Sequence, residues 1–281
     1  MAVWLAAAAL FGLGVARNLG HEAGVEFATG CLIEFSLSLD NVLVIALLFS
    51  YFGTPAREQH RVLFWGILGA LLMRGVLIGV GVVLINRFDW MFYFLGAFLV
   101  LTGARMFLSH GGKPEPEKSF VLRLARRIYP VSPKVEGRAF FTTLNGRRAM
   151  TPLALVLVLI ETSDLVFALD SIPAIFAVTT KPFIVFTSNV FAVLMLRSLY
   201  FLLAGAIRYF RHLKSGLAVV LVFIGVRMFL RVPPGTTASW YQIEIPTSTS
   251  LWVVGAILAL SILASLADPA AKPKHRGGDR S

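Results

Sequence analysis

The chain has 281 residues, of which 57% are hydrophobic and 15% are charged, whereas soluble domains carry about a quarter charged residues. This composition excludes an ordinary soluble domain and indicates a protein that crosses a membrane several times. The net charge of +11 would suggest a nucleic-acid partner in a soluble protein, but loop Lys and Arg residues set the topology of a membrane protein, so we expect no nucleic-acid binding. Because Cys31 is the only cysteine, disulfides within the chain and cysteine-based zinc sites are also excluded.

The first half of the chain contains four apolar segments that we predict to be spans. Residues 1–16 are short for a span, whereas residues 25–52 would form a helix of about 42 Å, against a hydrocarbon core of roughly 30 Å. We therefore expect this second helix to be tilted or broken, and we prefer a break near residues 36–41. Residues 61–87 and 90–109 form the next two predicted spans.

A long polar segment, residues 111–148, separates the two halves and holds nine Lys and Arg residues. Residues 120–129 within it form either a basic amphipathic helix on the membrane surface or a plain connector. Four more spans are predicted, at residues 149–178, 183–209, 215–232 and 251–266. The fold class is therefore all-α, a polytopic transmembrane bundle of about eight spans that ends in a basic tail.

Positive charge predicts the orientation of the chain. Of the 26 Lys and Arg residues, four lie within spans, eighteen lie on one side of the predicted bundle and four on the other. Loops rich in Lys and Arg stay in the cytoplasm. We therefore expect a multi-pass protein of the bacterial inner membrane with both termini and the 111–148 loop in the cytoplasm.

Three consecutive spans in each half carry polar residues in the same order. FLGAFLVLTGARMFL (residues 94–108) and GLAVVLVFIGVRMFL (residues 216–230) end alike. The paired positions are Glu34 with Asp164, Asp40 with Asp170, Arg74 with Arg197, and Arg105 with Arg227. Chance similarity between apolar segments is the alternative explanation.

Because each unit has three spans, the two copies must cross the membrane in opposite directions. This is the inverted-repeat arrangement of secondary transporters, whose sites lie near the midplane where interrupted helices meet. The expected division is a first helix and loop (1–24), a first repeat (25–110), a cytoplasmic loop (111–148), a second repeat (149–232), a loop and last helix (233–267), and a tail (268–281).

Five carboxylates lie inside the two acid-rich spans, where each costs roughly 2.5–3.5 kcal/mol on insertion scales. Small polar residues accompany them, so the chain offers oxygen ligands of the kind that Mn²⁺, Mg²⁺ and Ca²⁺ prefer. The candidate metal ligands are Glu34, Asp40, Asn41, Glu161, Asp164, Asp170 and Ser171. Asp40 and Asp170 are predicted to be related ligands from opposite halves that share one ion near the midplane.

Arginines inside the spans offer a different explanation for the same carboxylates. Arg74 and Arg197 are expected to balance the carboxylate charge, and simple ion pairing would then hold the bundle together without any cation. Counting Arg105 and Arg227 as well, four arginines face five carboxylates, which leaves one negative charge. We favour the cation site, and structural ion pairing remains the alternative.

Three segments resemble the signatures of the TerC/Alx family of bacterial integral membrane proteins. They are FATGCLIEFSLSLDN, QHRVLFWGILGALLMRG and ETSDLVFALDSIPAIFAVT, and the resemblance extends over residues 26–230. It implies a membrane protein of metal homeostasis, linked to manganese export and tellurium resistance. It also implies that Glu34, Asp40 and Asn41, and Asp164, Asp170 and Ser171, are functional positions.

The sequence therefore predicts an exporter of a divalent cation, with manganese as the expected ion, that is not an enzyme and carries no cofactor beyond its transported ion. Its partners would be membrane lipid and the metal ion. The alternative is a non-transporting membrane scaffold for metalloenzymes at the outer face or for other membrane proteins in metal or tellurite stress. An enzyme of redox or tellurite chemistry is disfavoured, because one cysteine cannot form a redox pair within the chain.

The topology can be tested by cysteine labelling in a background that lacks Cys31. New cysteines at Ser132 and Ser281 should react with a membrane-impermeant reagent only after the cells are opened, because the charge bias keeps both positions in the cytoplasm. Labelling of either position from the outer face of intact cells would refute the orientation.

Overall fold

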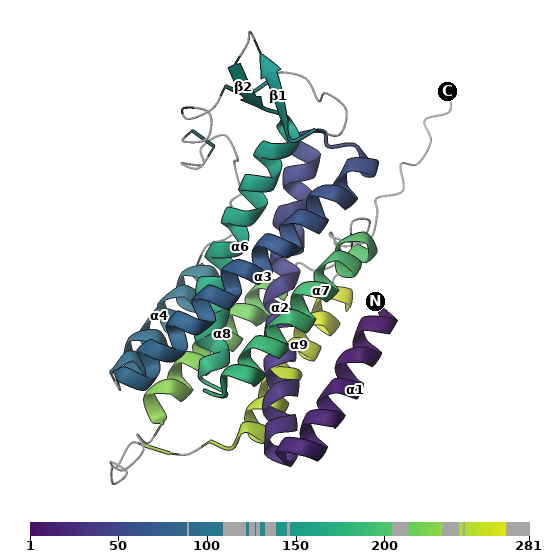
Figure 1. Ribbon diagram of the computed structural model, residues 1–281. Helices are drawn as coiled ribbons and strands as arrows, with labels where there is room; N and C mark the ends of the chain where they lie inside the picture. Colours follow the sequence, from purple (N-terminus) through teal and green to yellow (C-terminus); the bar gives the residue numbers. More distant parts are fainter. Residues whose placement is uncertain are drawn as a thin grey trace, which may run out of the picture.

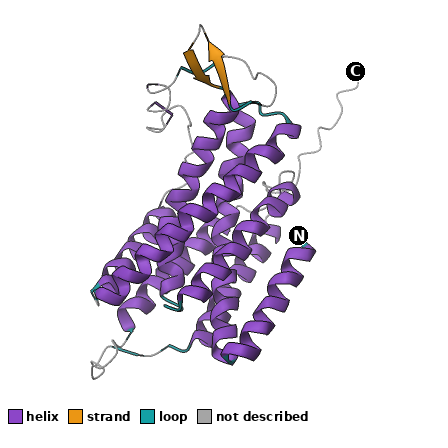
Figure 2. Cartoon of the chain, viewed as in Figure 1, coloured by secondary structure: helices purple, strands orange, loops and turns teal. Residues whose placement is uncertain are grey.

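The computed structural model describes residues 1–88, 90–108, 122–123, 127, 130–132, 139–144, 147–203, 213–231, 242–243 and 245–267. These residues form a bundle of long helices with a small β-hairpin at one end (Figures 1 and 2). The helices are α1 (Ala2–Leu19), α2 (His21–Tyr51), α3 (Ala56–Arg87), α4 (Met91–Leu108), α6 (Pro152–Phe176), α7 (Pro182–Leu203), α8 (Leu213–Leu230) and α9 (Thr247–Ala267).

The predicted class, a polytopic helical membrane protein, is confirmed. In the described part of the chain, seven helices are long and apolar enough to cross a membrane, and α8 contributes a shorter apolar helix, Ser215–Leu230. The eight helices correspond to the eight predicted spans. The predicted surface helix at residues 120–129 lies largely outside the described residues, as does the tail after residue 267.

The predicted break near residues 36–41 is wrong, because α2 is one continuous helix of 31 residues. Its polar side chains do not disrupt the backbone ladder: the hydroxyl of Thr29 donates to the carbonyl of Val25, and that of Ser36 to Leu32. The helix α6 also continues through Pro173 to Phe176, so neither acid-rich helix is interrupted at its carboxylates. At about 46 Å, α2 must tilt or extend beyond the hydrocarbon core.

A β-hairpin replaces the start of the span that we predicted from residue 149. Strands β1 (Phe141–Leu144) and β2 (Arg147–Met150) pair antiparallel, and α6 begins only at Pro152. The hydroxyl of Thr151 accepts from the N–H of Ala154, which makes Thr151 the N-cap of α6. Ser132 is buried beside this hairpin, so the exposed Thr143 is a better labelling position for the topology experiment.

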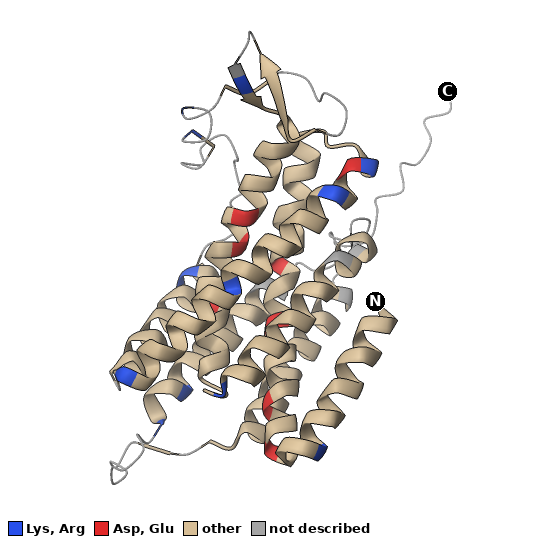
Figure 3. Cartoon of the chain, viewed as in Figure 1, with Lys and Arg blue, Asp and Glu red and all other residues tan. Residues whose placement is uncertain are grey.

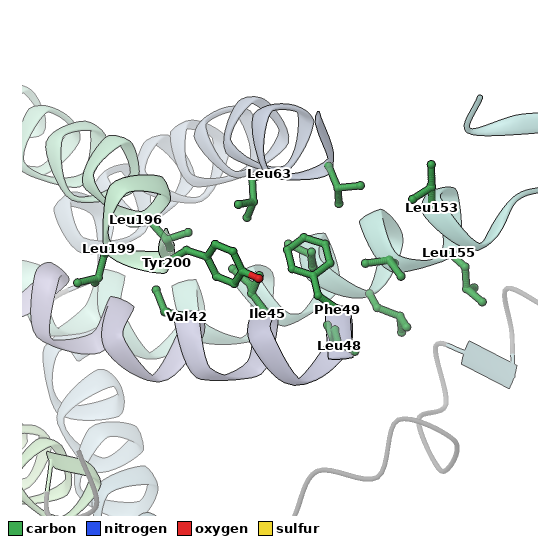
Figure 4. Close-up of a cluster of buried hydrophobic side chains, with 14 of the residues drawn as sticks. Val42, Ile45, Leu48, Phe49, Leu63, Leu153, Leu155, Leu196, Leu199 and Tyr200 are labelled. Atoms are coloured by element: carbon green, nitrogen blue, oxygen red, sulfur yellow. The ribbon is translucent and has the colours of Figure 1, made fainter. Parts of the chain in front are cut away.

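A large apolar cluster joins helices of the two halves near the hairpin end of the bundle (Figure 4). It packs Val42 and Phe49 of α2 with Leu63 of α3, Leu155 of α6 and Tyr200 of α7. The Tyr200 hydroxyl donates to Gln59 of α3, so the polar tip of this buried ring is satisfied. The two repeats therefore interlock through a common core.

Helix pairing follows the inverted repeat that the sequence predicts. The most extensive contacts join α2 to α7, α3 to α6, and α4 to α8. Replacing each helix by its repeat mate exchanges the first two pairs and leaves the third unchanged. The structure thus has the pseudo-two-fold relation of an inverted repeat.

The crossing of α4 and α8 shows the same relation residue by residue. A Cβ atom on Gly103 would lie 2.8 Å from the carbonyl oxygen of Ala218, and one on Gly225 would lie 2.7 Å from that of Gly96. The sequence alignment of the repeats relates Gly103 to Gly225 and Gly96 to Ala218, each 122 positions apart. Small residues let the two backbones approach closely, as at other helix crossings in membranes.

We predict that Gly225→Ala lowers the thermal stability of the purified protein, because its Cβ would meet the backbone of α4. Gly79→Ala is the matched control, since a Cβ there meets nothing within 4 Å. Alanine favours a helix over glycine by about 1 kcal/mol, so Gly79→Ala should be neutral or stabilising. Equal melting temperatures for the two variants in the same detergent would contradict the close crossing.

Candidate functional site

Arg74 of α3 binds two carboxylates that come from opposite halves of the chain. Its Nη1 lies 2.7 Å from Glu34 Oε2 of α2, and its Nε lies 3.1 Å from Asp164 Oδ2 of α6. Its Nη2 also donates to Asp164 Oδ1 at 3.1 Å, so the guanidinium holds Asp164 with two parallel hydrogen bonds. Figure 3 shows acidic segments at several levels of the bundle, some of them beside basic segments.

Two amide side chains complete this cluster. Asn189 of α7 accepts a hydrogen bond from Arg74 Nη1 at 2.8 Å and donates to Glu34 Oε1 at 2.5 Å. Asn41 of α2 donates to Asp164 Oδ1 at 2.7 Å. We call Glu34, Asn41, Arg74, Asp164 and Asn189 the central cluster, and it joins four helices.

Burial makes the central cluster energetically demanding. Each of its five residues is at most 4% exposed, and Glu34 is fully buried. Charges removed from water in this way remain ionised only when they are paired and hydrogen-bonded. Two carboxylates and one guanidinium leave the cluster with a formal charge of −1 if all three groups are ionised.

Asn189 is a member of the cluster that the sequence analysis missed. It lies within the predicted span 183–209, where a polar amide in an otherwise apolar helix indicates a hydrogen bond to a neighbouring helix. Asn41 was recognisable because it follows Asp40, whereas the span that holds Asn189 contains no carboxylate.

Other predicted ligands lie outside the central cluster. A carboxylate oxygen of Glu161 is buried without a hydrogen-bond partner and lies against Gly69 of α3, where a Cβ atom would collide with it. The Ser171 hydroxyl is buried and likewise has no partner. Asp170 is half-buried and is hydrogen-bonded by Thr102 of α4. The side chain of Arg197 lies outside the described part of the structure.

The positions of Asp40 and Asp170 argue against direct sharing of one ion, although their pairing stays a prediction. The helices α2 and α6 run in opposite directions (Figure 1). Asn41, the neighbour of Asp40, contacts Asp164, whereas Asp170 lies six residues, about 9 Å, further along α6. The lateral distance between the helices adds to this separation, and the structure instead joins Glu34 to Asp164.

A cavity of about 20 Å³ lies beside the central cluster and has room for roughly one water-sized species. Asn41 and Asp164 line it, together with apolar side chains of α2, α3, α6 and α7. The Oδ1 atom of Asn41 is buried and has no hydrogen-bond partner. Among the described residues no three His, Cys, Asp or Glu side chains converge on one metal position, because Arg74 lies between Glu34 and Asp164.

We predict that Arg74→Ala destabilises the protein by about 3–5 kcal/mol, because it leaves two buried carboxylates without their counter-charge. Arg105→Ala, which removes an exposed arginine at the end of α4, is the control. Unfolding in a denaturing detergent would measure both variants.

A triple variant separates the loss of charge from the loss of packing. Arg74→Met together with Glu34→Gln and Asp164→Asn removes all three charges with similar side-chain volume, so most of the lost stability should return. If Arg74→Ala were as stable as Arg105→Ala, pairing with Arg74 would not be what stabilises the two buried carboxylates.

Comparison of the sequence with known proteins shows the family of this chain. The sequence profile of the integral membrane protein TerC family matches residues 19–272. An uncharacterized membrane protein of Myxococcus xanthus is 49% identical over 94% of this chain and 80% of its own length. The putative membrane-bound redox modulator Alx of Escherichia coli K12 is 45% identical over 93% of this chain and 79% of its own. No solved structure matches. The chain belongs to the TerC family of integral membrane proteins.

Proposed function

We propose that the chain exports a divalent cation across the bacterial inner membrane, with manganese as the first candidate substrate. The observation that carries this proposal is the cavity between Asn41 and Asp164, beside an amide oxygen that has no partner. Carboxylate and amide oxygens in this arrangement suit hard divalent ions. The family resemblance points to the same class of substrate.

Arg74 has a defined part in this proposal. It offsets one of the two negative charges of Glu34 and Asp164 while the site holds no cation, and an incoming divalent ion competes with it for Asp164. Since α2 and α3 belong to one repeat and α6 and α7 to the other, releasing Asp164 from Arg74 loosens a contact between the repeats. Ion binding is thereby coupled to movement of one repeat against the other, as alternating access requires.

The remaining predicted ligands keep a role in the proposal, but Asp40 and Asp170 no longer share one ion. Asp40, Asp170, Glu161 and Ser171 are assigned to the ion path on either side of the central cluster. Both termini face the cytoplasm, the basic segment 111–148 is cytoplasmic, and metalloenzymes at the outer face are the expected protein partners. The protein acts without a bound cofactor and is not an enzyme.

A membrane scaffold or redox role is the second candidate, favoured by the printed name of the relatives called putative membrane-bound redox modulator. In this chain the lone Cys31 lies with its sulfur 3.8 Å from the backbone oxygen of Ser188. A redox role would therefore depend on a partner's thiol or cofactor. Reconstitution separates the candidates, because a transporter moves Mn²⁺ in liposomes without other proteins and a scaffold does not.

We predict that proteoliposomes containing the wild-type chain show Mn²⁺ uptake, measured with an enclosed Mn²⁺-sensitive dye. Asp164→Asn should reduce uptake to the level of empty liposomes, because it keeps the hydrogen-bonding shape but removes the charge that holds the ion. Asp40→Asn and Asp170→Asn should do the same, as residues of the ion path.

Glu22→Gln is the matched control, because this exposed carboxylate lies at the start of α2 and not at the central cluster. It should transport as the wild type does, and gel filtration and melting temperature confirm that each variant is folded. Wild-type rates in all three aspartate variants would rule out the proposed site. A wild-type protein that moves no divalent ion would favour the scaffold.

A further inference from the structure

A second polar cavity lies at the opposite end of the bundle from the hairpin. Its volume is about 480 Å³, and it is enclosed by the start of α2, the connection between α6 and α7, the end of α8 and the residues that lead into α9. It is distinct from the central cluster, because the two cavities have no lining residue in common. The proposed orientation places it at the outer face of the membrane.

Arg227 supplies an unsatisfied donor at this second cavity. Its Nη2 donates to the backbone oxygen of Ile245 at 3.0 Å, but its Nη1 is buried and has no hydrogen-bond partner. A buried cationic donor without a partner is costly, and an anion is the group that removes this cost most effectively.

The other charges around the cavity favour an anion as well. Glu26 is occupied by Lys181, whose Nζ lies 3.0 Å from its Oε2, and by the Thr179 hydroxyl at 3.0 Å. Of the other described lining residues, Arg227 and Arg231 are positive and Glu22 is negative, and it is Arg227 that has a buried guanidinium nitrogen without a partner. Arg231 also lies with its guanidinium 4.1 Å above the ring of Phe92, which fixes it near the cavity.

Among the described residues, the repeat mate of Arg227 has different surroundings. Arg105 in ARMFL is the repeat mate of Arg227 in VRMFL. Arg105 is exposed at the end of α4. Two arginines with the same local sequence thus have different surroundings. The difference comes from the residues before α9, which provide Ile245 and part of the cavity wall.

We propose that Arg227 binds a phosphate group at this end of the bundle. Its buried Nη1 can donate to a phosphate oxygen while its Nη2 keeps the contact with Ile245. Arg227 lies in the last turn of α8, and the end of an apolar span is the level of lipid headgroups. The phosphate belongs either to an anionic lipid headgroup or to a free phosphate anion. This site is independent of the proposed cation transport.

The test measures thermal stability of the full chain with two probes. Inorganic phosphate is added to the detergent-purified protein against chloride at equal ionic strength, and nanodiscs of phosphatidylglycerol are compared with nanodiscs of phosphatidylcholine. A higher melting temperature with inorganic phosphate identifies a free anion, and one only with phosphatidylglycerol identifies a lipid headgroup.

Variants connect the response to the site. Arg227→Gln should weaken phosphate binding by about tenfold or more, Arg227→Lys should restore only part of it, and Arg105→Gln should leave it unchanged. If Arg227→Gln does not fold, Arg227→Lys decides the question, since it keeps the positive charge but removes the guanidinium donor at the site. The proposal is overturned if neither probe stabilises the wild type, or if the folded site variant responds as the wild type does.

Discussion

The ion pairing of Arg74 with Glu34 and Asp164 is the interaction on which the arrangement of the bundle depends. It connects α2 and α3 of the first repeat to α6 of the second, and Asn189 extends the connection to α7. Apolar side chains alone give little reason for these helices to choose one axial alignment within lipid. A buried charge network favours one axial alignment, because displacing one helix by a single turn would leave a charge unpaired.

The inverted repeat explains why such a network lies at the centre. Glu34 and Asp164 are equivalent positions of the two copies, and helices of opposite direction bring them to one arginine. Arg74 has a repeat mate in Arg197. The repeat mate of Asn189 is Gly66, which has no polar side chain, so the cluster is not symmetric. This asymmetry leaves a negative charge beside the small cavity at Asn41 and Asp164, which is the proposed cation site.

The two repeats also differ at the end of the bundle opposite the hairpin. The repeat gives α4 and α8 nearly identical ends, yet in the described part of the chain Arg227 contacts Ile245, which follows its helix, whereas Arg105 is exposed. The central cluster has an excess of negative charge, whereas Arg227 at the other cavity has a buried cationic donor without a partner. The proposed cation site and the proposed anion site can therefore exist in one small bundle without competing.

Much of the fold followed from the sequence alone, because the cost of placing polar groups in lipid limits the choices. Long apolar segments predicted the spans, and polar residues within them, such as Glu34, Arg74 and Asp164, were recognisable as sites. The repeat was visible because arginines recur in the same order. The continuity of α2 was not predicted, since the satisfaction of Ser36 by the carbonyl of Leu32 depends on a local rotamer that the sequence leaves open.

Only the tertiary structure decided which of these polar residues meet. Asp40 and Asp170 looked equivalent to Glu34 and Asp164 in sequence, but the opposite directions of α2 and α6 bring the latter pair to Arg74. Asn189 and the enclosure of Arg227 also depend on the axial alignment of helices that are far apart in the chain. That alignment is set by side-chain packing and charge pairing between helices, which no single segment encodes.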